Sequence, residues 1–202
     1  MTTKDYLHML QTDIHSTIFA TIAADGHPQV RSIDVMLSDE NSVYFLTAKG
    51  KEFYRQLTTQ NYVALSGVKD GVSISLRGNI RKADPALLDE VFKVNPYMAD
   101  LYPGDTRSAL EVFQLYEGQG EYFDLNQKPV FRESFTLGEA QKTESGYFVT
   151  DACIGCKLCE QVCPQKCITT TEKPVVIQQE HCLHCGRCME VCPKRAIIRQ
   201  CR

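Results

Sequence analysis

Two runs of four cysteines carry the clearest chemistry in this chain of 202 residues. Both have the spacing Cys-x2-Cys-x2-Cys-x3-Cys-Pro, from Cys153 to Cys163 and from Cys182 to Cys192. In this spacing the first three thiolates hold one iron–sulfur cluster, and the fourth cysteine ligates the other cluster. The runs therefore predict two [4Fe–4S] clusters with crossed ligands. The first set is Cys153, Cys156, Cys159 and Cys192, and the second is Cys182, Cys185, Cys188 and Cys163.

Cysteines at close spacing can also have functions other than cluster ligation. A single C-x2-C pair could form a zinc site or a redox dithiol, and a cysteine-rich chain could form a disulfide framework. Two complete runs that both end in Cys-Pro disfavour these alternatives. The segment Asp151-Ala-Cys-Ile-Gly-Cys-Lys-Leu-Cys and the 18 residues between Cys163 and Cys182 resemble bacterial two-cluster ferredoxins. The resemblance covers about residues 145–200 and includes Gly155 and Gly186, since tight backbone around a cluster favours glycine.

Two of the ten cysteines lie outside these sets. Cys167 stands where the resemblance places a small apolar residue, so we expect it to fill the core. Cys201 is next to last, and we expect a frayed end there. The two runs match each other, which indicates a duplicated half-domain. No other repeat is evident in the sequence.

Charge is unevenly distributed along the chain. Residues 153–202 carry 8 Lys and Arg against 4 Asp and Glu, whereas the whole chain has a net charge of −3. A basic tail can indicate nucleic acid. Each cluster with four thiolates is itself negative, however, and the basic residues offset that charge. They also do not interleave with aromatic residues as in a nucleic-acid groove, so we predict no nucleic-acid partner.

The sequence also gives expectations about location. It has no apolar run of transmembrane length, and its first residues lack the charged-then-apolar layout of a secretory signal. Ten cysteines in such a chain favour a reducing compartment and metal ligation. We therefore expect a cytoplasmic protein without a membrane partner.

The first part of the chain has the alternation and turns of short antiparallel strands. Strands are expected at about residues 16–24, 29–37, 42–47, 62–67, 72–81, 110–116 and 120–125. Helices are expected at about residues 4–12, 51–59 and 85–94. The first three strands should form a meander, and the last two a pair. Short strands with few helices predict a closed or nearly closed barrel.

Three segments carry a second resemblance: Phe19 to Ser32, Val43 to Leu57, and Asn61 to Leu65. They are similar to the FMN-binding split barrels of the pyridoxamine 5'-phosphate oxidase superfamily. The resemblance implies an α+β fold, in which a mainly antiparallel split β-barrel precedes the small ferredoxin-type two-cluster α+β domain. It also implies a homodimer with FMN between the subunits. The expected domains are the FMN-binding split barrel at residues 1–126, a linker at 127–146 and the two-cluster domain at 147–202.

The same resemblance implies six FMN-binding residues, namely Arg31, Ser32, Ile33, Thr47, Lys49 and Lys51. Arg31 would face the phosphate, and Ser32 and Ile33 would line the ring or the ribityl chain. Thr47, Lys49 and Lys51 would complete the phosphate site. Arginine and lysine give charge-assisted hydrogen bonds to phosphate, and a helix that begins near Lys51 adds free amides. The alternative is that these charges are ordinary solvated surface.

Three functions remain open from the sequence. The first is a flavin- and iron–sulfur-dependent oxidoreductase that passes single electrons between the clusters and FMN to reduce an unidentified small substrate. Its partners would be a ferredoxin or reductase and a small-molecule electron acceptor. The second is a non-catalytic electron carrier or a redox- or flavin-binding sensor. The third keeps the barrel but places haem or a deazaflavin in it.

True pyridoxamine phosphate oxidation is not expected. The namesake enzyme ends in a basic, aromatic segment that helps bind pyridoxal phosphate, whereas this chain has cysteine runs there and no Trp. No Ser–His–Asp or Cys–His arrangement is evident either, so catalysis would centre on the flavin. The five histidines are expected at the surface or in packing roles.

Overall fold

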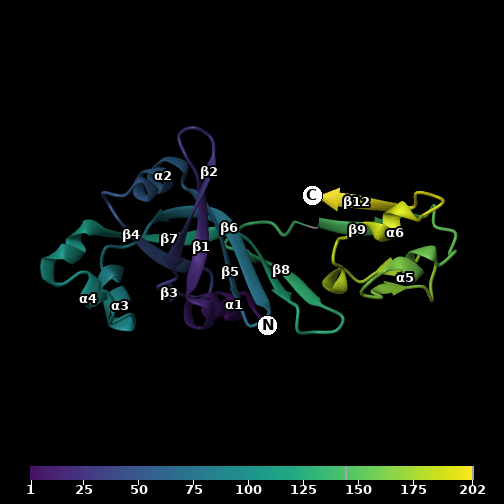
Figure 1. The fold of residues 1–202 in the computed structure, drawn as a ribbon, viewed down its shortest axis with the longest axis horizontal. Helices are drawn as coiled ribbons and strands as arrows, with labels where there is room; N and C mark the ends of the chain where they lie inside the picture. The colour runs from purple at the N-terminus through teal and green to yellow at the C-terminus, as the bar shows by residue number, and fades with distance from the viewer. Residues whose placement is uncertain (144, 202) are drawn as a thin grey trace. The chain divides into compact units, whose positions relative to one another are not determined.

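The computed structural model describes residues 1–143 and 145–201, and of Cys201 only the backbone (Figure 1). Glu144, in the expected linker, and Arg202, in the expected two-cluster domain, lie outside the described residues. The chain forms two compact units. The first comprises Met1–Tyr122 and Ser134–Gln141, and the second comprises Phe123–Glu133 and the described residues from Lys142 onward.

The first unit is built on one curled antiparallel sheet (Figure 1). The strands are β1 (Ser16–Ile22), β2 (Pro28–Asp34), β3 (Leu37–Ser38), β4 (Val43–Ala48), β5 (Tyr62–Lys69), β6 (Val72–Lys82), β7 (Leu110–Asp124) and β8 (Phe131–Leu137). Their order is β2-β1-β5-β6-β7-β4-β3, and β8 pairs with β7. The predicted fold class, a mainly antiparallel split barrel with few helices, is confirmed.

Helical segments connect or precede these strands. They are α1 (Thr3–Met9) with a π-helical continuation (Leu10–Ile14), α2 (Glu52–Gln60), α3 (Leu87–Val94), α4 (Met98–Leu101) and a 3-10 segment (Gly104–Ala109). Burial alternates along β1, because successive side chains of a strand point to opposite faces. The inward face presents Phe19, whose ring lies 4.6 Å from that of Phe45 and 6.2 Å from that of Phe53 on α2. This aromatic cluster fixes α2 against the sheet.

Two expectations about strand pairing were wrong. The second expected strand is divided into β2 and β3, so β4 pairs with β3 at its start and with β7 along its length, and not with β2. Leu110–Asp124 forms one long strand, β7, where two were expected. A Cβ atom at Gly118 would collide with the Arg77 carbonyl oxygen, and one at Gly78 would collide with the Glu117 carbonyl oxygen. These glycines therefore permit a close approach of two backbones.

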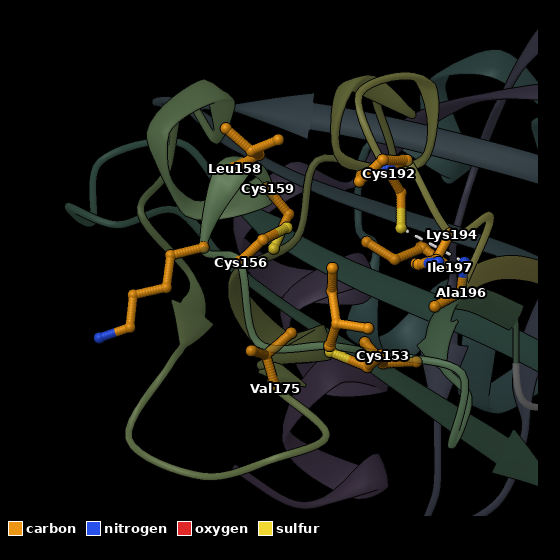
Figure 2. Close-up of a pocket in the computed structure, with 13 residues that line it drawn as sticks. Cys153, Cys156, Leu158, Cys159, Val175, Cys192, Lys194, Ala196 and Ile197 are labelled. Carbon is orange, nitrogen blue, oxygen red and sulfur yellow. Dashed lines mark hydrogen bonds between the residues drawn. The ribbon is translucent and has the colours of Figure 1, made fainter.

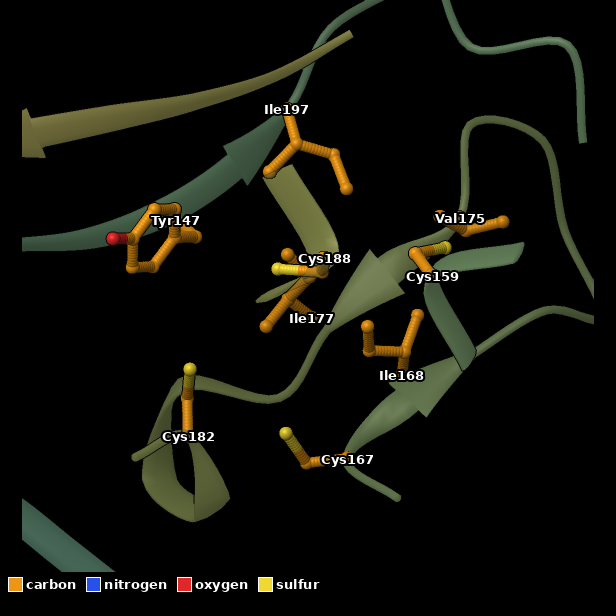
Figure 3. Close-up of a cluster of buried hydrophobic side chains, with 9 residues drawn as sticks. All are labelled: Tyr147, Cys159, Cys167, Ile168, Val175, Ile177, Cys182, Cys188 and Ile197. Atoms are coloured by element: carbon orange, nitrogen blue, oxygen red, sulfur yellow. The ribbon is translucent and has the colours of Figure 1, made fainter. Parts of the chain in front are cut away.

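The second unit is a small α+β fold. Strand β9 (Ser145–Val149) pairs with β12 (Ile197–Cys201), and β10 (Ile168–Thr169) pairs with β11 (Val176–Ile177). Short helices α5 (Leu158–Val162) and α6 (Arg187–Glu190) and a 3-10 turn (Gln179–His181) complete it. Figure 3 shows its buried core, Tyr147, Cys159, Cys167, Ile168, Val175, Ile177, Cys182, Cys188 and Ile197. Cysteines thus form part of the core itself.

The backbone of the second unit repeats after 29 residues. Gly155 and His184 share a positive φ, of 72° and 53°. Lys166 and Arg195 do as well, with φ of 50° and 49°. Lys157 and Gly186, which precede α5 and α6, form the third such pair. This geometry agrees with the duplication that the sequence indicated.

The expected linker, residues 127–146, has regular structure. It contains β8 and the first residues of β9. Its residues up to Glu133 and from Lys142 onward belong to the second unit, and Ser134–Gln141 belongs to the first. Among the described residues, no helix has the length and apolar character needed to cross a membrane.

Candidate functional sites

The first pocket of the second unit brings together one of the predicted cysteine sets. Figure 2 shows Cys156 and Cys159 side by side in its wall, with Cys153 and Cys192 apart from them. The first three come from the loop before α5 and from α5 itself, and Cys192 comes from the other cysteine run. The rest of the wall is Val149, Ile154, Lys157, Leu158, Val175, Pro193, Lys194, Ala196 and Ile197. Apart from two lysines, this wall is apolar.

The second pocket is lined by the other predicted set. These cysteines are Cys163, Cys182, Cys185 and Cys188, and a fifth cysteine, Cys167, joins them. The remaining lining residues are Pro164, Gln165, Ile168, Ile177, Leu183, Gly186 and Arg187. The Sγ atoms of Cys163 and Cys167 are 3.5 Å apart. From the sequence we expected only a packing role for Cys167, although it follows Cys163 by four residues.

The donor set of each pocket fits a [4Fe–4S] cluster, which takes four cysteine thiolates. Backbone amides also point at ligand sulfurs: the Ala196 amide donates to Cys192 Sγ at 3.3 Å, and the His184 amide donates to Cys182 Sγ at 3.4 Å. Such hydrogen bonds stabilise thiolate charge. Among the described residues, no group of three or more His, Cys, Asp or Glu side chains is arranged to hold a single metal ion.

Burial and hydrogen bonding set the thiol pKa values apart. Burial raises the pKa of Cys159, and it raises the pKa of Cys188 to about 11. The hydrogen bond with Cys167 lowers the pKa of Cys182 to about 6 and raises the pKa of Cys167. Iron binds the thiolate, so ligation by Cys159 and Cys188 must release protons.

Part of the expected linker supports the second pocket. His181 Nδ1 lies 2.8 Å from the Val130 carbonyl oxygen, and the Val130 amide donates to Gln165 Oε1 at 3.0 Å. Arg132 Nη1 donates to the Cys182 carbonyl oxygen at 3.1 Å. Arg132 also brings a positive charge that lowers the pKa of Cys182. Sequence reasoning missed this role, because Val130 and Arg132 lie 35–51 residues before their partners.

Arg31 on β2 lies beside α2 in the first unit. Its Nη1 donates to Thr21 Oγ1 at 2.6 Å, and its Nη2 donates to Gln29 Oε1 at 3.3 Å and to Gln56 Oε1 at 3.1 Å. Its guanidinium carbon lies 4.4 Å from the centroid of the Phe53 ring. Burial lowers the pKa of Arg31. Gln56, which accepts from Arg31, is 4% exposed. The sequence reading missed it, although a glutamine on the same helical face as Phe53 and Leu57 indicates a buried polar contact.

The other expected FMN residues lie on β2 and around the start of α2. Ser32 is exposed and Ile33 is half-buried on β2. At the end of β4, Thr47 is 2% exposed and its Oγ1 has no hydrogen-bond partner among the described residues. Lys49 Nζ donates to the Ser108 carbonyl oxygen at 3.1 Å, and Lys51 is the N-cap residue of α2, with no side-chain capping bond. Arg31 and Lys51 thus both lie at α2, and a buried hydroxyl lies on the strand before it.

Two known families match the chain. Residues 5–120 match the family described as pyridoxamine 5'-phosphate oxidase, and residues 152–196 match the 4Fe-4S dicluster domain. The comparison with curated proteins gave no match.

Solved structures share the fold of the first unit. A NimC/NimA family protein from Clostridium acetobutylicum is 22% identical with a TM-score of 0.56, over 67% of this chain and 93% of that one. A general stress protein 26-related protein of the pyridoxinephosphate oxidase family, from the same organism, is 16% identical with a TM-score of 0.53, over 65% and 94%. A haem-binding protein from Mycobacterium smegmatis is 13% identical with a TM-score of 0.53, over 67% and 58%.

A split barrel of flavin-binding type followed by a dicluster domain defines a redox or electron-transfer protein with iron–sulfur clusters and a flavin. The chain belongs to the pyridoxamine 5'-phosphate oxidase family, whose match covers more than half of its residues.

Proposed function

We propose that this chain is an FMN- and iron–sulfur-dependent oxidoreductase that passes single electrons between two [4Fe–4S] clusters and FMN to reduce a small substrate. The observation that carries the proposal is the pair of pockets, each lined by one predicted set of four cysteines, in a chain of this family. When bound, clusters transfer single electrons and FMN accepts one or two, so together they convert one-electron donation into two-electron reduction.

The cysteines of each pocket would hold one cluster, three from one run and one from the other. The ligand from the other run ties the two halves of the second unit together. Lys157 and Lys194 in the first pocket and Arg187 in the second offset the negative charge of the bound groups. The apolar walls exclude water, which strengthens the amide hydrogen bonds to sulfur.

Arg31, Lys49 and Lys51 would hold the FMN phosphate at the start of α2. The α2 amides and the guanidinium supply donors for a dianion. Ser32 and Ile33 would contact the ribityl chain or the ring. The hydroxyl of Thr47, which has no partner in the described part of the chain, would supply a buried donor for the phosphate. Gln29 and Gln56 would hold Arg31 in place.

A second copy of the chain would complete the flavin site. Val30 on β2, Ile18 and Ile22 on β1, and Tyr62 and Val68 on β5 are 45–71% exposed. They lie on neighbouring strands and project from the face opposite to Phe19. Large apolar side chains grouped on one face favour contact with another protein surface, and a homodimer fits the expectation that two barrels share the flavin groove.

The test is anaerobic turnover with the full-length protein loaded with FMN and clusters. Dithionite or a reduced ferredoxin supplies electrons, and a nitro compound, a quinone or free flavin serves as acceptor. We expect acceptor reduction that depends on both FMN and clusters. A matched Cys153→Ala variant should bind FMN but lose reduction by ferredoxin. Reduction of the protein without turnover of any acceptor would favour the non-catalytic carrier and overturn the enzyme proposal.

A further inference from the structure

The two cluster pockets differ at one position of the internal repeat. Cys167 follows Cys163 by four residues in the second pocket, and Ala196 follows Cys192 by four residues in the first. Both residues line their pockets and are at most 2% exposed. The repeat therefore needs only a small side chain here, and a thiol occurs in one half only.

The fifth thiol faces the predicted ligands of the second cluster. Its Sγ lies 3.5 Å from Cys163 Sγ, and Cys182 lines the same pocket. Figure 3 shows Cys167 and Cys182 in the same buried group. Cysteines that bind iron are thiolates without a proton. Cys167 is then the S–H donor of the 3.5 Å contact, and Cys163 is the acceptor.

We propose that Cys167 is a tuning residue of the second cluster site, whose thiol donates its one hydrogen bond to the thiolate of Cys163 and makes the second cluster easier to reduce than it would be without that donor. Hydrogen bonds to the sulfurs set the potential of an iron–sulfur cluster. A donor stabilises the reduced state more, because that state carries more negative charge. The inference rests on the cluster assignment of the proposed function, but not on any substrate.

A reciprocal pair of variants tests this inference. Cys167→Ala gives the second pocket the residue of the first, and Ala196→Cys gives the first pocket the residue of the second. The readout is an anaerobic redox titration of the full-length protein, followed by electron paramagnetic resonance, with iron and sulfide counted in each sample. Cys167→Ser keeps a donor of similar size and serves as the conservative control.

We expect Cys167→Ala to lower the reduction potential of the second cluster and to leave that of the first cluster unchanged. At a fixed ambient potential, the ratio of reduced to oxidised second cluster should fall by up to about tenfold, equal to about 59 mV for one electron. Ala196→Cys should raise the reduction potential of the first cluster. Cys167→Ser should stay closer to the unmodified protein than Cys167→Ala does.

Unchanged potentials in a fully loaded Cys167→Ala protein would overturn the proposal. If Cys167→Ala and Cys167→Ser both lose the second cluster, Cys167 has a structural or ligand role and the proposal is again overturned. If only Cys167→Ala loses the second cluster, the redox titration of Ala196→Cys tests the donor role instead. An unchanged reduction potential of the first cluster in Ala196→Cys then rejects that role. An unmodified protein without two clusters would instead reject the cluster assignment itself.

Discussion

Replacing Arg31 with alanine should weaken FMN binding about tenfold to hundredfold and leave the clusters intact. The guanidinium is held by Thr21, Gln29 and Gln56 and stacks on Phe53 at 4.4 Å. These three hydrogen bonds use three of its five N–H donors. A bond from a fixed, charged group to phosphate contributes on the order of 1.5–3 kcal/mol, which corresponds to that range of affinity.

The fold should survive this change, because the partners of Arg31 also bond to one another. Thr21 Oγ1 donates to Gln56 Oε1 at 2.5 Å, and Gln56 Nε2 donates to Gln29 Oε1 at 3.1 Å. Arg81→Ala is the matched control. Arg81 likewise donates to a glutamine, Gln114, at 2.8 Å and lies 4.5 Å from an aromatic ring centroid, but it is not among the expected FMN residues.

The assay is titration of flavin-free protein with FMN and, in parallel, with riboflavin, which lacks the phosphate. Arg31→Ala should weaken FMN binding and change riboflavin binding little, and Arg31→Lys should fall between, since lysine keeps the charge but not the planar fork. Unmodified protein and Arg81→Ala should behave alike. An Arg31→Ala protein with undiminished FMN affinity would refute the phosphate role, and equal losses for both flavins would show that Arg31 acts on the fold or the ring.

Three further predictions concern the clusters and assembly. Purified protein should contain about eight iron and eight sulfide per chain, from two cubes, and one or two zinc without sulfide would reject the clusters. Cys163→Ala, made together with Cys167→Ala so that the neighbouring thiol cannot substitute, should remove the second cluster and spare the first; loss confined to the first cluster would contradict crossed ligation. Val30→Glu should produce monomers in sedimentation and weaken FMN retention, whereas Leu101→Glu, at an exposed apolar position on α4, should do neither. A monomeric unmodified protein that still holds FMN tightly would contradict the shared groove.

Local patterns were sufficient to predict much of the fold. The alternation of β1 and the apolar spacing of α2 follow from backbone geometry, which repeats every two residues in a strand and every 3.6 in a helix. Most strands and helices accordingly lie within a few residues of their expected positions. The long strand β7 was missed because Gly118 lies within it, where the backbone at Gly78 of a neighbouring strand leaves no room for a side chain. A contact between residues 40 apart in the chain has no local sequence signature.

The expected FMN residues also show which features follow from local sequence and which depend on tertiary contacts. The sequence indicated Arg31 only through the family resemblance, and the contacts that orient it depend on how α2 packs on the sheet. Gln56 is buried beside Phe53 because the aromatic cluster fixes the rotation of α2. Thr47 Oγ1 has no hydrogen-bond partner among the described residues, because Thr47 lies with Phe45 on the buried face of β4.

The sequence by itself determined the chemistry of the cysteine runs, since ligand type and spacing are local properties of the chain. It also determined that the unit around them is a repeat. Only the tertiary structure decided that Phe123–Glu133 belongs to that unit and that Cys167 faces the second pocket rather than general core. The physical reason is that burial and hydrogen bonding join groups distant in the chain, as when Arg132 meets the Cys182 carbonyl oxygen at 3.1 Å.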